Sequence, residues 1–358
     1  MGIEYELLPP EKRKPKYTDE TQLGFGQIFT DHMFTMKFHR DRGWYEPKIG
    51  PYRPIPMDPA SMCLHYAQMI FEGLKAYRGK GGEIYLFRPQ ENARRMNRSA
   101  ERMCMPLVDE DMFLEAVKEL VKVERDWIPR GKGTSLYIRP TMIATEKALG
   151  VHVSSEYLFF IILSPVGAYY AEGFNPTKIY VMEEYVRATP GGTGHIKAAG
   201  NYAASLYASS LAAQKGYTQV LWLDAIHRRF VEEVGTSNIF FIIGDELVTP
   251  PLGGTILPGV TRDSVITLVS SWGIPVVERQ ISMEEVMEAH KKGSLKEVFA
   301  SGTAAVISPV GLLYYRGQEI KINDGKVGLL TERLYEELMK IQYGEAEDPF
   351  GWRILVNN

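Results

Sequence analysis

Hydrophobic residues recur along the first half of the chain with two spacings, which predict both strands and helices. Short β-rich runs predict strands. Apolar residues at helical spacing, with acids in the first turn, predict one long helix, and Pro89 marks the start of another. The predicted strands are Met33–Phe38, Ile84–Phe87, Leu136–Pro140 and Tyr157–Leu163, and the long helix is Asp109–Trp127.

The second half shows the same mixture. The predicted strands there are Lys178–Val181, Gln219–Leu223, Ile239–Ile243 and Pro275–Val277, and the predicted helices are Tyr202–Lys215, Thr261–Trp272, Ser282–His290 and Gly328–Tyr343. One helix opens with Ser282-Met283-Glu284-Glu285, the spacing of a capping box. Because strands and helices do not follow the strict alternation of a doubly wound sheet, the pattern predicts an α+β protein.

A chain of 358 residues is long for a single domain. Residues 167–176 have no hydrophobic period and carry Gly and Pro, which indicates a linker. We therefore expect a small N-terminal α+β domain over residues 1–166 and a large C-terminal domain over residues 177–358.

Composition excludes several classes of function. The chain has 41 Lys and Arg against 44 Asp and Glu, and these are interleaved, so no basic face is offered to nucleic acid or to an anionic membrane. The two cysteines, Cys63 and Cys104, form no metal-ligand pattern, which argues against a disulfide framework and a zinc cluster. We expect no metal. The start of the chain lacks the order of a signal peptide, and we expect a cytoplasmic protein.

Three segments could carry chemistry. The first places Lys197 among Ile, Ala and Gly residues. Partial burial would disfavour the ammonium form and make the amine a nucleophile or a Schiff-base former. A lysine that snorkels from a helix start explains the same pattern.

The second segment, Leu257-Pro258-Gly259-Val260-Thr261, leads into a predicted helix whose first N–H groups could bind a phosphate. An ordinary helix start is the alternative. The third segment has Glu232 and Glu233 just before an apolar strand. Adjacent strand residues face opposite sides, so one carboxylate can be solvated while the other is buried and paired. A pair solvated at a strand edge is the other possibility.

Together these three features suit a pyridoxal phosphate site. A lysine holds the aldehyde, a carboxylate keeps the ring nitrogen protonated, and a helix N-terminus neutralises the phosphate.

The ordered motifs closely resemble those of branched-chain amino acid aminotransferases, which belong to the class IV, fold-type IV group of pyridoxal phosphate enzymes. The matching segments run nearly end to end and include Phe29-Thr30-Asp31-His32-Met33, Phe71-Glu72-Gly73-Leu74-Lys75, Ser135-Leu136-Tyr137-Ile138-Arg139-Pro140, Glu233-Val234-Gly235-Thr236-Ser237-Asn238, Leu257-Pro258-Gly259-Val260 and Ser301-Gly302-Thr303-Ala304. The resemblance implies the two-domain fold of D-amino acid aminotransferase, with pyridoxal 5'-phosphate in the interdomain cleft.

The resemblance also implies roles for single residues. Lys197 would form the Schiff base and shuttle the Cα proton, Glu233 rather than Glu232 would pair with the pyridine nitrogen, and Tyr202 would bond the ring hydroxyl. The other implied cofactor-binding positions are Arg95, Thr236, Leu257, Gly259, Val260, Thr261 and Thr303. Among them, Arg95, the N–H groups of Val260 and Thr261, and the Thr303 hydroxyl would hold the phosphate.

For the substrate, the resemblance implies an apolar pocket walled by Phe25, Phe71, Tyr137, Thr236 and Ala304. Tyr66 and the backbone around Thr303 would receive the α-carboxylate, and Arg139 would receive the second carboxylate of glutamate or 2-oxoglutarate. Val151, from the segment Leu149-Gly150-Val151 of the neighbouring subunit, would close the pocket. A homodimer or a higher homo-oligomer follows.

The leading hypothesis is a ping-pong aminotransferase acting on L-leucine, L-isoleucine or L-valine, their 2-oxo acids, and glutamate or 2-oxoglutarate. A D-amino acid transaminase or an aminodeoxychorismate lyase would share the cofactor, but the long N-terminal region and the apolar pocket argue against both. A silent binding or assembly partner is a third hypothesis, which predicts loss of the lysine or the glutamate. Ala305 and Ser308 stand where animal members carry a Cys-x-x-Cys pair, so their redox switch is not expected here.

Overall fold

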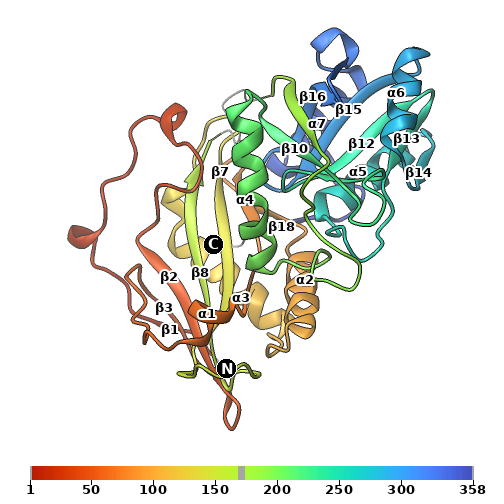
Figure 1. Ribbon diagram of the computed structural model, residues 1–358. Coiled ribbons are helices and arrows are strands. Elements are labelled where there is room, and N and C mark those ends of the chain that lie inside the picture. The colour runs from red at the N-terminus through yellow and green to blue at the C-terminus, as the bar shows by residue number, and fades with distance from the viewer. Residues whose placement is uncertain (1, 168–173, 357–358) are drawn as a thin grey trace. The chain divides into compact units, whose positions relative to one another are not determined.

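The computed structural model describes residues 2–167 and 174–356, and Figure 1 shows their path. The chain divides into two compact units. Within the described residues, the first unit comprises 2–167, 197–199 and 339–356, and the second comprises 174–196 and 200–338.

The C-terminal residues do not follow the expected division. We expected residues 177–358 to form one domain, but the last strand, β18, pairs antiparallel with β6 of the first sheet. In addition, Trp352 accepts the N–H of Arg88 through its carbonyl and packs its ring on Phe87. These contacts place the end of the chain in the first unit. Most of the expected linker, residues 168–173, lies outside the described residues.

The first unit is built on one mixed sheet (Figure 1). In sheet order, its strands among the described residues are β1 (Glu4–Tyr5), β3 (Gly43–Pro51), β2 (His32–His39), β8 (Glu156–Val166), β7 (Ser135–Ala144), β5 (Leu74–Arg78), β6 (Ile84–Phe87) and β18 (Arg353–Leu355), and β4 (Met69–Phe71) also pairs with β7. The two longest strands, β7 and β8, run past their predicted ends at Pro140 and Leu163. Pro165 is tolerated because it lies beyond the part of β8 that pairs with β2.

Alternation along β7 gives this sheet two different faces. Leu136 and Ile138 point into the hydrophobic core, where they join residues of the helices α2 (Pro89–Arg102) and α3 (Glu110–Val123). Tyr137 and Arg139 therefore point to the other face. Register pairing brings Lys75 opposite Tyr137 on that face. Phe71 lies there too, because it pairs with Thr141 of β7. We call the face that carries Phe71, Lys75, Tyr137 and Arg139 the aromatic face.

The predicted long helix ends earlier than its apolar period suggests. Asp109 caps α3 by accepting the N–H of Met112 at 2.9 Å, as the acidic first turn predicts. The helix stops at Val123, and residues Arg125–Trp127 form a 3-10 turn, η3. At this point Glu124 turns inward to accept the N–H of His32 at 2.8 Å. The remaining short helices of this unit are η1 (Pro10–Lys12), η2 (Glu20–Gln22) and α1 (Met62–Tyr66).

The second unit has its own mixed sheet, whose order among the described residues is β11 (Val231–Val234), β10 (Gln219–Leu223), β9 (Thr177–Met182), β16 (Val306–Tyr315), β15 (Leu295–Gly302), β12 (Asn238–Ile243), β13 (Glu246–Thr249) and β14 (Val276–Glu278), with β17 (Gln318–Lys321) paired to β16. Its other elements are α4 (Ala199–Gln214), α5 (Val260–Ser271), α6 (Met283–Lys291), η4 (Asn323–Gly325) and most of α7 (Leu329–Tyr343). The expected α+β architecture is confirmed.

The capping box predicted for α6 forms only in part. Ser282 accepts the N–H of Glu285 at 3.1 Å, as predicted. The Glu285 carboxylate instead pairs with Arg279. A charged partner outcompetes the neutral backbone N–H that the motif would offer. Among the described residues, none of the helices is long and apolar enough to cross a membrane.

Candidate active site

Lys197 is held by the first unit. Its backbone N–H donates to Ser99 Oγ at 3.1 Å, its carbonyl accepts the N–H of Phe71 at 3.2 Å, and the next residue, Ala198, forms a β-bridge with Ile70. The side-chain Nζ lies 4.8 Å from the centroid of the Phe71 ring. The edge of β4 and helix α2 thus place this amine at the aromatic face.

Four of the predicted substrate-pocket positions, Phe25, Phe71, Tyr137 and Arg139, meet beside Lys197 at this face. The Arg139 guanidinium lies 4.6 Å from the Phe71 ring centroid and donates to the Tyr137 hydroxyl at 3.0 Å. The Phe25 ring meets the Tyr137 ring edge-on at 5.0 Å. A side chain at Gly73 would overlap the Tyr137 hydroxyl, so only glycine leaves room for this hydroxyl just before β5. The result is an aromatic wall that holds one cation, beside the Lys197 amine.

Beneath Lys197, Arg95 forms a buried ion pair with Glu72. Its Nε and Nη2 donate to the two carboxylate oxygens at 2.7 and 2.9 Å, and Asn92 donates to the same group at 2.8 Å. Burial alone would raise the pKa of Glu72, but the charge and hydrogen bonds of Arg95, with the charge of Lys197, hold it below its ordinary value. The phosphate-binding role of Arg95 stays a prediction.

A second amine of the aromatic face was not singled out from sequence. Lys75 lies opposite Tyr137 and is only 6% exposed. Burial lowers its pKa to about 7. A lysine within a strand usually points to solvent. Only the pairing of Lys75 with Tyr137 shows that it faces the aromatic side chains, and the sequence pattern does not indicate this pairing.

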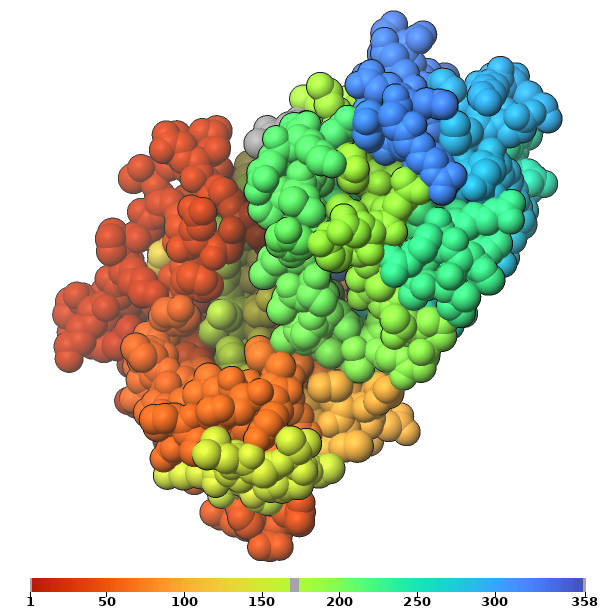
Figure 2. All heavy atoms as spheres, viewed as in Figure 1, coloured from red at the N-terminus to blue at the C-terminus, as the bar shows by residue number. Residues whose placement is uncertain are grey.

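Tyr66 contacts a surface loop of its own chain. It ends α1, and its hydroxyl donates to the Leu149 carbonyl. Backbone bonds from Met62 and Ala148 also join α1 and its preceding turn to this loop. In Figure 2 the loop around residue 150, in yellow-green, lies on the surface against the orange segment that contains α1. Val151 at its tip is 82% exposed.

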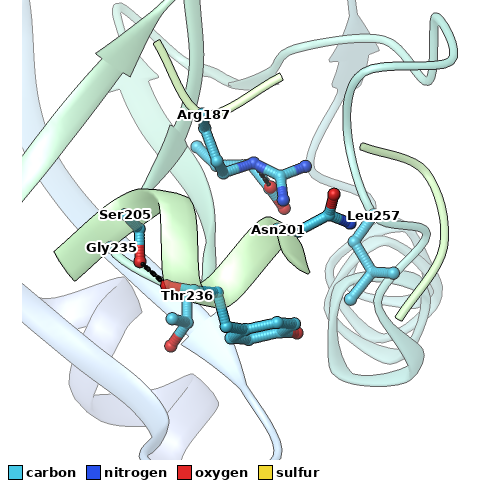
Figure 3. A pocket seen from close by; sticks show the side chains of 8 residues that line it. Arg187, Asn201, Ser205, Gly235, Thr236 and Leu257 are labelled. Atoms are coloured by element: carbon cyan, nitrogen blue, oxygen red, sulfur yellow. Dashed lines mark hydrogen bonds and ion pairs between the residues drawn. The ribbon is translucent and has the colours of Figure 1, made fainter. Parts of the chain in front are cut away.

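The second unit contains a separate pocket, shown in Figure 3. Its lining residues come from the segment between β9 and α4, from α4, from the end of β11 and the turn that follows it, and from the loop before α5. They are Arg187, Asn201, Tyr202, Ser205, Glu233, Gly235, Thr236 and Leu257. Four of them, Tyr202, Glu233, Thr236 and Leu257, were predicted to bind the cofactor. Arg187, Asn201 and Ser205 were not, because no local motif marks them.

Both glutamates of β11 are buried, which corrects the expectation that one or both could be solvated. Glu233 pairs with Arg187 and accepts a hydrogen bond from Asn238 at 3.0 Å. Glu232 accepts from the Thr255 hydroxyl, and burial raises its pKa. Both acids are buried because other segments contact them: Arg187 and Asn238 contact Glu233, and the loop that holds Thr255 contacts Glu232.

The start of α5 has the form of an anion cradle. Gly259 is its N-cap, and no side chain caps the first N–H groups. A Cβ on Gly259 would overlap the amide oxygen of Asn238. Only glycine therefore lets the backbone at the start of α5 lie this close to the Asn238 side chain. N–H groups that no side chain caps, with the positive end of the helix dipole, favour a phosphate.

The turn that holds Thr303 and Ala304 lies at the same sheet edge as Thr236. Asn238 pairs with Ser301 at the junction of β12 and β15. The residues that precede Asn238 and those that follow Ser301 therefore leave the sheet side by side. A Cβ on Gly302 would come within 3.0 Å of the Ser237 hydroxyl, which shows how closely the two turns approach.

Comparisons with known proteins identify the family of the chain. The family model of class IV amino-transferases matches residues 69–313. A Bacillus subtilis (strain 168) protein named branched-chain-amino-acid transaminase 1 is 54% identical over 99% of each chain. The Escherichia coli branched-chain amino acid aminotransferase structure has a TM-score of 0.77 and 29% identity, covering 91% of this chain and 99% of its own.

The chain belongs to the class IV aminotransferase family. The family and fold type predicted from the sequence motifs are therefore confirmed. A branched-chain aminotransferase from Thermobaculum terrenum, described in its PLP-form (holo-form), has the same fold, with a TM-score of 0.75 and 26% identity over 93% of this chain and all of its own.

Each unit of this class IV aminotransferase contains residue types that a pyridoxal phosphate cofactor uses. The second unit offers a buried carboxylate at Glu233, a phenol at Tyr202 and the uncapped start of α5. The first unit offers the amine of Lys197. An acid, a phenol, an amine and an anion cradle are the donor set that this cofactor requires.

The buried pair makes a testable prediction. Replacing Glu72 by Gln (Glu72→Gln) removes the carboxylate that pairs with the buried Arg95 guanidinium, which we expect to destabilise the first unit by about 3–5 kcal/mol at pH 7. Hydrogen exchange of the α2 amides and chemical denaturation measure the loss. The matched control, Glu91→Gln, removes an exposed partner of Arg94 and should cost less than about 1 kcal/mol.

The pH dependence has a definite sign. Because the folded-state pKa of Glu72 is lowered, its contribution is present above the ordinary carboxyl range and disappears as pH falls through the folded value. The stability difference between wild type and Glu72→Gln should therefore shrink on acidification. Equal losses in both variants, or a gap independent of pH, would contradict this account.

Proposed function

We propose that this enzyme moves the α-amino group between L-leucine, L-isoleucine or L-valine and 2-oxoglutarate in a ping-pong sequence. The observation that carries the proposal is the placement of the Lys197 amine beside the aromatic wall and guanidinium of Phe71 and Arg139. The curated relatives bear the name of this transaminase, and the chain matches them along nearly all its length.

Pyridoxal 5'-phosphate, when bound, supplies a ring that accepts electrons and carries the amino group between donor and acceptor. In the proposal, the Lys197 amine holds the cofactor and moves the proton at the substrate Cα. Glu233 faces the pyridine nitrogen, and Tyr202 bonds the ring hydroxyl. Arg95, the N–H groups of Val260 and Thr261, and the Thr303 hydroxyl hold the phosphate. Thr236, Leu257 and Gly259 are the remaining predicted cofactor-binding positions.

The aromatic face accounts for the side-chain preference. Phe25, Phe71 and Tyr137 offer ring surfaces to a branched aliphatic side chain, and one buried methylene is worth only about 1–3 kcal/mol. We therefore propose modest selectivity among leucine, isoleucine and valine. Thr236 and Ala304 complete the wall in this proposal, and Tyr66 with the backbone at Thr303 and Ala304 receives the α-carboxylate.

The lysine is the first test. Lys197→Ala should lower transamination turnover by at least about 1,000-fold, because both the attachment point and the proton carrier are lost. Purified holoenzyme is assayed with L-leucine and 2-oxoglutarate. The control, Lys292→Ala, removes an exposed lysine paired with Glu288 and should leave turnover unchanged. Full activity of Lys197→Ala would overturn the proposal.

Substrate profiling separates the competing functions of the same fold type. We expect turnover with L-leucine, L-isoleucine and L-valine, and little with D-alanine or aminodeoxychorismate. A preference for D-alanine would favour a D-amino acid transaminase, and turnover of aminodeoxychorismate alone would favour a lyase. Inactivity with all of them would favour a binding or assembly role.

Arg139 makes a prediction about the acceptor. A guanidinium held against Phe71 and Tyr137 is suited to a second carboxylate. Arg139→Gln should raise KM for 2-oxoglutarate about 10–100-fold, the equivalent of one charged hydrogen bond. KM for L-leucine should change little. Arg42→Gln, which removes an arginine stacked on Tyr45, is the control. A parallel rise in both KM values would show that Arg139 does not select the dicarboxylate.

We also propose that the enzyme is a homodimer or a higher oligomer in which Val151 of one subunit reaches the pocket of another. Leu149 and Val151 are 67% and 82% exposed, although both are apolar. Neighbouring exposed apolar residues of this kind are what an interaction site requires. Sedimentation equilibrium should give at least twice the mass of one chain. Val151→Asp should weaken association and lower kcat/KM for L-leucine, and a wild-type monomer with full activity would contradict the assembly.

A further inference from the structure

Arg187 lies where three segments of the second unit meet. Its side chain is buried, and its Nε contacts the Glu233 carboxylate. Its Nη2 donates to the carbonyls of Gly194 at 2.7 Å and Thr255 at 2.5 Å. Figure 3 shows the guanidinium beside the pocket, with a dashed line marking the ion pair with Glu233.

Two of these segments lead to residues that are proposed to bind the cofactor. Gly194 belongs to the turn that precedes Lys197, which is closed by the Ile196 N–H bonded to the Thr193 carbonyl. Thr255 belongs to the loop that ends at the N-cap of α5, Gly259. A Cβ on Gly194 would overlap the Thr255 carbonyl, so the turn and the loop touch directly. Arg187 bridges them at this contact.

The third segment is β11, with its two buried acids. Arg187 contacts one oxygen of Glu233, and Asn238 donates to the other at 3.0 Å. Asn238 also donates to the Leu257 carbonyl at 2.9 Å, which links Glu233 to the same loop. The charge of Arg187 also acts on Glu232, against the effects of burial and of Asp224. One buried cation therefore serves two neighbouring acids.

We propose that Arg187 is the positioning residue for the proposed pyridine-nitrogen acid: it keeps Glu233 ionised and aimed into the pocket, and it ties the turn before Lys197 to the loop before α5. This inference rests on the proposed role of Glu233. Without the guanidinium, two adjacent buried acids would favour protonation. A neutral carboxylic acid cannot hold a proton on the pyridine nitrogen by charge.

The Arg187 side chain contributes both a positive charge and a set of hydrogen bonds. Its charge sets the ionisation of Glu233, whereas its forked hydrogen bonds tie two carbonyls together. Arg187→Gln removes both. Arg187→Lys keeps the charge but cannot reproduce the fork. Arg262→Lys is the matched control, because Arg262 is also buried and bonds one acid, Glu278, and one carbonyl, that of Pro250.

The experiment uses holoenzymes prepared with pyridoxal 5'-phosphate, and measures kcat/KM for L-leucine, the absorbance of the bound cofactor, and the Kd for pyridoxal 5'-phosphate, each across pH. Arg187→Gln should lose about 100-fold in kcat/KM at neutral pH and recover partly at higher pH, because a raised Glu233 pKa needs more alkaline solution for ionisation. The absorbance transition should shift in the same direction. Arg187→Lys should keep the wild-type pH profile while Kd rises about tenfold, the effect of one lost hydrogen bond.

A purely structural arginine would behave differently. Arg262→Lys should lower the unfolding temperature without moving the pH profile or the absorbance transition, and the same behaviour in both Arg187 variants would overturn the inference. Glu233→Gln is measured in parallel. If it retains wild-type activity and absorbance, the proposed role of Glu233 fails, and the inference fails with it. If Glu233→Gln is impaired while Arg187→Gln keeps the wild-type pH profile, only the inference about Arg187 fails.

Discussion

A buried guanidinium must be neutralised where it lies, and this requirement organises the candidate site in both units. In the first unit, Arg95 and Glu72 join α2 to the turn between β4 and β5, and α2 also holds the backbone N–H of Lys197 through Ser99. In the second, Arg187 and Glu233 join β11 to two loops. Burying each ion pair costs desolvation free energy, which the attraction between the two charges offsets only when their geometry is good. The surrounding segments therefore cannot shift independently, which is the preorganisation that positions catalytic groups.

Much of the fold could be predicted from sequence because local patterns dominate where strands and helices are amphipathic. Ile84–Phe87 matches the predicted strand at both ends, and Asp109 caps α3 as its first turn predicts. Motif order also identified the family, because so many segments match in sequence. Lys197 and Glu233 were found through this resemblance, with physical reasons for each, but the roles assigned to them remain proposals.

What could not be predicted depends on contacts between residues far apart in the chain. Glu232 was a candidate for solvation because nothing nearby in sequence shows that Thr255 covers it. Arg187 belongs to no motif, and its importance follows only from carbonyls at positions 194 and 255. Residues 353–355 fall in the C-terminal domain expected from sequence because nothing near them in the chain indicates their pairing with β6. The helix after Asp109 was overestimated for a similar reason, since Glu124 is drawn to a backbone N–H of β2.

The alternation of side chains along β7 limits how this protein can change over evolution. Strand side chains have a period of two, so inserting or deleting one residue within β7 would exchange its faces. Ile138 would then turn toward the aromatic face, and Tyr137 and Arg139 would enter the core between the sheet and α2. A two-residue change preserves parity but breaks the pairing with β5 and β8. Length variation among homologues should therefore be confined to the loops, while this strand tolerates substitution only.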